Sequence, residues 1–141
     1  MPKNNDKRPL PQQHKRSHYN DYHGRGIYMI TLCIDGRLPL LGTLTGASPE
    51  TASISPSSLG SQVLECWNNI PSIQKQFAKM KAERTGEFCQ RNISLIACQL
   101  MPDHFHGIIF VRTEMDVSIG DVVRGFMVGC TKAYNRKYTT E

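Results

Sequence analysis

The pair His104 and His106 is the feature of this sequence with the clearest chemical potential. The segment that carries it, His104–Arg112, is rich in β-branched and aromatic residues, which predicts a strand. Residues i and i+2 of a strand point to the same face, so both imidazoles would reach one ion while Phe105 enters the core on the opposite face. Neutral imidazole is a common ligand of divalent metals. The alternative interpretation is a pair of histidines with ordinary hydrogen bonds.

Asp103 directly precedes the histidine pair and has two interpretations. Its carboxylate can accept a hydrogen bond from an imidazole and so orient a metal ligand without touching the metal. It also suits the tight turn that Met101–Asp103 predicts between a strand at Asn92–Leu100 and the histidine strand. Both interpretations place Asp103 beside the pair.

The other elements follow from hydrophobic periodicity and turn signals. Ile27–Ile34 predicts a central strand that ends at the turn signal Asp35-Gly36. Pro39–Leu44 is a candidate for a short strand paired with it. Thr43–Ser58, rich in serine, threonine and proline, predicts a surface loop.

Two helices are predicted from apolar residues at helical spacing. The first begins near Ser57 or Ser58 and is expected to stop at Pro71. Lys75–Arg91 is charged and suggests a ragged helical extension followed by a loop. The second helix begins at Ser118.

The order of these elements predicts an α+β fold. A ferredoxin-like split β-α-β sandwich, with an antiparallel sheet and helices on one face, accounts for it best. The final strand of that topology is not visible before Glu141. We expect one domain over residues 27–141, preceded by a basic and flexible lead over residues 1–26.

Composition limits the class of protein. The 141 residues carry a formal net charge of +5, which favours a polyanionic partner. No apolar run reaches the roughly 18–20 residues of a membrane span, and the basic start does not resemble a signal peptide. The five scattered cysteines fit reduced thiols, so we expect a cytoplasmic protein. The best candidates for contact with phosphate are Arg124, Lys132, Arg136 and Lys137. The alternative interpretation of these residues is a solvated helix face.

The segment Met101–Ile109, MPDHFHGII, resembles the metal-binding signature of the IS200-like (Y1, HUH) family, in its REP-associated tyrosine transposase type. Other segments resemble the same family in the same order. Asp21-Tyr22 and Gly26–Cys33 are similar to the family's lead-in and first strand, and Leu41-Gly42 resembles the strand that follows. Val63–Pro71 resembles its first helix. Its second helix is similar to Gly120–Phe126 with Thr131, Lys132 and Asn135.

This resemblance implies a mechanism of DNA transposition. His104 and His106 would be catalytic residues that hold a divalent metal, Mg²⁺ or Mn²⁺, on a phosphate of single-stranded or hairpin DNA. A tyrosine hydroxyl would attack that phosphate and form a covalent phosphotyrosine. The implied partner is DNA, and no membrane is involved.

The sequence departs from the family pattern after Lys137. Neither the last strand nor the nucleophile helix has a counterpart, so we expect a C-terminally truncated and catalytically incomplete domain. Tyr134 and Tyr138 are the alternative nucleophiles. A missing strand would leave an edge of Ile27–Ile34 unpaired, which predicts a homodimer or another edge-strand association. The rival hypotheses are a DNA-binding remnant without activity and a small metal-dependent phosphohydrolase.

Overall fold

The structure, a computed structural model, describes residues 22–138. Most of the basic lead, including Asp21, therefore lies outside the described residues. The elements are β1 (Gly26–Cys33), a 3-10 turn η2 (Asp35–Arg37), β2 (Gly42–Thr45), β3 (Ser53–Pro56), α1 (Ser58–Asn68), α2 (Ile70–Thr85), β4 (Ile93–Leu100), β5 (His104–Val111) and α3 (Ile119–Tyr138).

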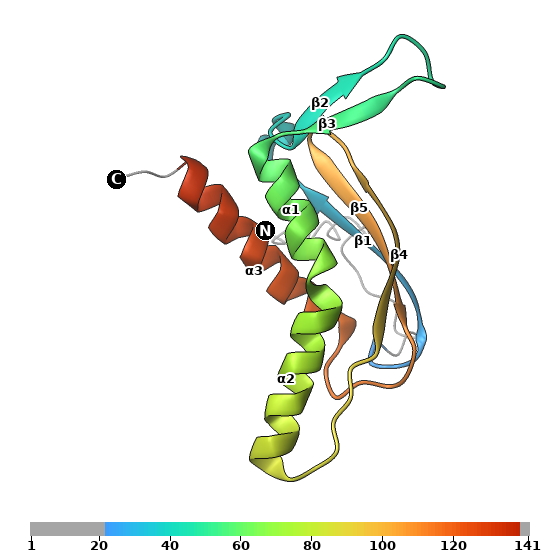
Figure 1. The fold of residues 1–141 in the computed structure, drawn as a ribbon, viewed down its shortest axis with the longest axis vertical. Helices are drawn as coiled ribbons and strands as arrows, with labels where there is room; N and C mark the ends of the chain where they lie inside the picture. Colours follow the sequence, from blue (N-terminus) through green and yellow to red (C-terminus); the bar gives the residue numbers. More distant parts are fainter. Residues whose placement is uncertain (1–21, 139–141) are drawn as a thin grey trace, which may run out of the picture.

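The main sheet is antiparallel, with the strand order β1-β5-β4 (Figure 1). The central strand β5 is the one that carries the histidine pair. Its register places Cys33 of β1 opposite His104, and Thr31 opposite His106. The expectation of an α+β fold with antiparallel strands is confirmed at this level.

All three α-helices lie on one side of this sheet, and the core fills the space between them (Figure 1). Phe105, Ile109 and Val111 alternate along β5 and have no exposed surface. Trp67 of α1 packs edge-on against Phe105, with ring centroids 5.1 Å apart. No helix or strand of residues 22–138 covers the opposite face of the sheet, where Met29 of β1 is 72% exposed. We call this the open face.

The prediction of a loop over Thr43–Ser58 is wrong, because β2 and β3 pair there as an antiparallel ribbon. The ribbon extends from one end of the main sheet (Figure 1). The short strand expected as a partner of β1 therefore pairs with β3 instead.

The prediction that Pro71 stops a helix is also wrong. The break falls at Asn69, and Pro71 lies in the first turn of α2. Proline suits this position because the first N–H groups of a helix have no intrahelical acceptor. The helix continues regularly to Thr85 and ends at Gly86, whose φ of 72° is left-handed.

Candidate functional site

The structure brings the two predicted metal ligands together on the open face of the sheet. The rings of His104 and His106 lie with their centroids 4.7 Å apart and their planes at 77°. Both side chains are partly exposed, whereas Phe105 between them is fully buried. The alternation of the strand therefore gives the pair its common direction.

Each imidazole is held through its Nδ1 atom. Nδ1 of His104 lies 2.7 Å from Oδ1 of Asp103, and Nδ1 of His106 lies 3.0 Å from Oγ1 of Thr31. A carboxylate can only accept, so the hydrogen bond requires a proton on Nδ1 of His104, and in the neutral imidazole Nε2 then carries a free lone pair. Within residues 22–138, neither Nε2 atom has a hydrogen-bond partner.

This arrangement fits a divalent metal ion. Histidine ligands commonly bind the metal through one ring nitrogen and use the other for a carboxylate or another oxygen acceptor. No group of three or more histidine, cysteine, aspartate or glutamate side chains able to hold a metal is found among the described residues. Two imidazoles would leave the other coordination positions of such an ion to water or other oxygen ligands.

Asp103 lies in the turn between β4 and β5, which the bond from Met101 N to His104 O closes at 2.8 Å. Its backbone carbonyl accepts from Ile34 N at 2.9 Å, which ties this turn to the end of β1. Its side chain bonds His104 and also accepts from Arg37 Nε at 2.9 Å. The hydrogen bond from His104, followed by the one from Arg37, lowers the pKa of the Asp103 carboxyl below its usual value.

Sequence reasoning missed two residues of this site, Thr31 and Arg37. Thr31 lies opposite His106 only because of the β1–β5 register. Arg37 reaches Asp103 from 66 residues away in the sequence. The one local signal was the turn Asp35-Gly36, which brings the chain back toward the start of β5.

The structure does not bring the alternative nucleophiles to the histidine pair. Tyr134 and Tyr138 stack on each other on α3, with ring centroids 4.9 Å apart. The same helix places Phe126 against Phe105, so it covers the face of the sheet opposite the imidazoles. Tyr134 lines a cavity with Leu32 on that helix side.

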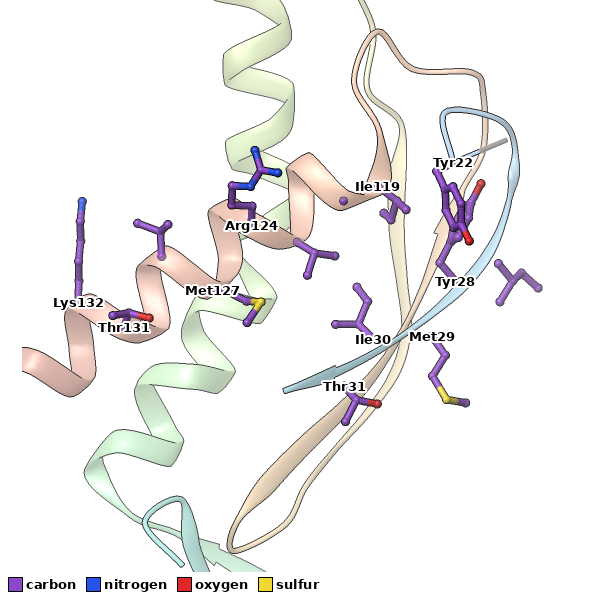
Figure 2. Close-up of a pocket in the computed structure, with 14 residues that line it drawn as sticks. Tyr22, Tyr28, Met29, Ile30, Thr31, Ile119, Arg124, Met127, Thr131 and Lys132 are labelled. Atoms are coloured by element: carbon purple, nitrogen blue, oxygen red, sulfur yellow. The ribbon is translucent and has the colours of Figure 1, made fainter. Parts of the chain in front are cut away.

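The four predicted phosphate contacts separate into two groups. Arg124 and Lys132 line a groove of about 930 Å³ between α3 and β1 (Figure 2). Lys137 instead donates to Ser58 at the start of α1, and Arg136 is exposed elsewhere on α3. Thr31 lines the groove and also bonds His106, so this one residue of β1 lies between the groove and the histidine pair.

Comparison with known proteins gives little further guidance. No family model matches the chain, and no solved structure matches it. It is similar to an uncharacterised protein of Haemophilus influenzae, at 28% identity over 142 aligned positions that cover 84% of this chain and 67% of that protein. None of the described helices is both long enough and apolar enough to cross a membrane.

Proposed function

We propose that this chain is a DNA-binding domain of the IS200-like, REP-associated tyrosine transposase type, built on a ferredoxin-like sheet. It binds single-stranded or hairpin DNA and holds a Mg²⁺ or Mn²⁺ ion with His104 and His106. The main support is that both imidazoles lie on one face of the sheet and are held through Nδ1, while no residue of the described part of the chain bonds either Nε2 atom. The resemblance of Met101–Ile109 to the family signature favours a nucleic-acid phosphate over a small phosphate ester.

The charges along the groove suggest how DNA would lie. Arg124 and Lys132 would bind backbone phosphates at the edge of β1. Thr31 connects this edge to His106, so a strand that crosses β1 passes from the cations to the histidine pair. When bound, the ion would supply Lewis-acid polarisation of the phosphodiester.

DNA cleavage needs a nucleophile on the same face as the histidines. The described tyrosines lie elsewhere: Tyr22 and Tyr28 line the groove, and Tyr134 and Tyr138 lie on α3. We therefore expect residues 22–138 to bind DNA without cutting it. A labelled hairpin incubated with the protein and Mn²⁺ should give no covalent adduct on a denaturing gel.

The His104→Ala and His106→Ala variants are expected to lose Mn²⁺ binding by more than about 100-fold, since loss of a residue that only orients a ligand already costs about 10–100-fold. Calorimetric titration with Mn²⁺ measures this directly. Hairpin affinity should fall in the same variants when Mn²⁺ is present and stay unchanged in chelator.

Gln99→Ala is the matched control, because Gln99 is exposed and lies opposite His106 on β4. Unchanged Mn²⁺ affinity in both histidine variants would contradict the proposed metal site. A covalent adduct that disappears in Tyr134→Phe would overturn the expectation of incomplete catalysis. Turnover of a phosphate ester without any adduct would instead support the phosphohydrolase.

We also propose that two copies associate through β1. Within residues 22–138 this strand pairs only with β5, so its other edge is available to a second copy when DNA does not occupy the groove beside it. Ile27 and Met29 add exposed apolar surface beside that edge, at 68% and 72% exposure. Apolar edge strands favour pairing with another chain.

Met29→Lys should convert the wild-type dimer to a monomer in sedimentation equilibrium, because a lysine at an edge opposes strand pairing. The fold should survive, since Met29 is mostly exposed. Ile96→Lys on the other edge strand, β4, is the control and should remain dimeric. A wild-type protein that stays monomeric with a strongly protected β1 in hydrogen exchange would contradict this association.

A further inference from the structure

Arg37 forms an exposed ion pair from a left-handed backbone, and a contribution to folding stability alone does not explain this combination. Its side chain is 59% exposed and pairs with Asp103 through Nε. Exposed ion pairs contribute little to folding. The backbone of Arg37 is also left-handed, with φ of 57°, a conformation that residues with a Cβ rarely adopt. Strained residues of this kind cluster where function requires a fixed geometry.

The contacts of Arg37 converge on the candidate site. Its Nη1 donates to Sγ of Cys33 at 3.7 Å, and Cys33 lies directly opposite His104 in the β1–β5 register. Its Nε donates to Oδ2 of Asp103, while Oδ1 of the same carboxylate accepts from Nδ1 of His104. The carboxylate is therefore fixed by one bond on each oxygen.

We infer that Arg37 is a positioning residue of the proposed metal site, which holds the Asp103 carboxylate so that His104 keeps its proton on Nδ1. This inference rests on the proposed role of His104 as a metal ligand. A carboxylate fixed at both oxygens cannot rotate away from the imidazole. Without the guanidinium it can rotate, and the tautomer with the proton on Nε2 gains population. That tautomer has no lone pair for a metal on Nε2.

The hydrogen bonds of the surrounding loop support the same assignment. Arg37 N donates to Ile34 O at 2.9 Å, which closes the turn. Ile34 N donates to the backbone carbonyl of Asp103, and Leu41 N donates to that of Pro102, each at 2.9 Å. The segment that carries Arg37 is thus attached on both sides to the turn that carries Asp103.

The test reads the tautomer of His104 in the metal-free protein. Long-range ¹H–¹⁵N correlation spectra in alkaline buffer distinguish Nδ1–H from Nε2–H. In the wild type we expect Nδ1–H alone, and in Arg37→Gln a mixture of both tautomers. Mn²⁺ affinity should fall about tenfold in the same variant, the lower end of the loss seen when a partner that orients a ligand is removed.

Two further variants separate positioning from folding. Arg37→Gly removes the side chain while permitting the left-handed backbone, so its melting temperature should match the wild type although its tautomer mixture and Mn²⁺ affinity change. Arg37→Lys keeps the positive charge, so its Mn²⁺ affinity should lie between those of the wild type and Arg37→Gln. Arg112→Gln is the control, because Arg112 donates to Ser94 on the same sheet and does not contact Asp103.

A His104 that stays entirely Nδ1–H in Arg37→Gln and Arg37→Gly would overturn the inference, whatever the metal does. A wild type that binds no Mn²⁺ would contradict the proposed function, and the tautomer measurement would still decide the role of Arg37. The two failures are therefore distinguishable.

Discussion

Gly107→Ala is expected to lower the free energy of unfolding by roughly 3 kcal/mol, the upper part of the range for an overpacked core. A Cβ at Gly107 would lie 2.3 Å from Cη2 of Trp67, a contact that real structures do not contain. Neither partner can easily yield. Gly107 lies in β5, which is hydrogen-bonded to a strand on each side, and Trp67 is only 1% exposed.

The rings around Trp67 explain why it cannot move. Phe105 and Phe126 both pack against its indole, with ring centroids at 5.1 and 5.8 Å. Phe105 separates His104 from His106, so a shift of the indole would also disturb the strand beneath the histidine pair. Denaturant unfolding measures the loss of stability, and the Mn²⁺ titration of the same variant measures its effect on the site.

Gly125→Ala provides the control for this variant. Gly125 is exposed on α3, and a Cβ there would meet no atom within 4 Å. Alanine in a helix interior is favoured over glycine by about 0.5–1 kcal/mol, so this variant should be slightly more stable than the wild type. If Gly107→Ala is as stable as Gly125→Ala, Trp67 does not pack directly against Gly107 of β5.

The parts of the fold that sequence could predict are those with a strong local period. The strand of His104–Arg112 alternates perfectly between core and open face, and its direction decides where both imidazoles point. Ser57 caps α1 as expected, because its side chain accepts from Gly60 N at 3.0 Å. In both cases the deciding interaction lies within a few residues, so a local pattern contains the answer.

The parts that sequence could not predict depend on distant partners. The ribbon of β2 and β3 contains Thr43, Thr45, Ser53 and Ser55, whose pairing is visible only after the chain folds back. Leu44 of β2 is 56% exposed, and Ile54 is the one apolar residue of β3 that packs against the core, so neither strand shows an alternation long enough to predict it. The same limit applies to Arg37, which joins the site through a carboxylate 66 residues away.

The role of α3 shows a third limit. Closeness in sequence predicts one basic patch on this helix, yet of its four candidate residues only Arg124 and Lys132 line the groove beside β1. Lys137 donates to Ser58 on α1 instead, and Arg136 lies one turn beyond Lys132, past the residues that line the groove. Tyr134 was considered for its chemistry, and the packing of α3 against the core side of the sheet placed it away from the histidines.

Asp116→Asn is expected to lower the free energy of unfolding by about 3–5 kcal/mol, because it leaves a buried guanidinium without its counter-charge. Arg91 is 8% exposed and donates to both oxygens of Asp116 at 2.8 Å. Its third bond goes to Oε1 of Gln74 at 2.9 Å, and Lys81 donates to Asp116 at 2.7 Å. The cluster joins α2 to the segment before α3.

The same carboxylate should control acid stability. The hydrogen bonds from Arg91, and after them the one from Lys81, hold the pKa of Asp116 far below its usual value of 3.8. A folded-state pKa that is depressed gives stability that is complete above the unfolded value and is lost as the pH falls through the folded one. Wild-type stability should therefore decline below about pH 4, and the decline should be shallower in Asp116→Asn.

Urea unfolding followed across this pH range compares the two proteins, with Glu83→Gln on the exposed side of α2 as the matched charge-removal control. Glu83→Gln should change stability by less than about 0.5 kcal/mol, the usual limit for surface substitutions. The triple variant Arg91→Met, Asp116→Leu, Gln74→Leu should recover much of the loss, because apolar residues of similar volume can replace a buried ion pair at little cost and Gln74 would otherwise lose its donor. If Asp116→Asn is as stable as the wild type and loses stability over the same acid pH range, water rather than Asp116 compensates the charge of Arg91.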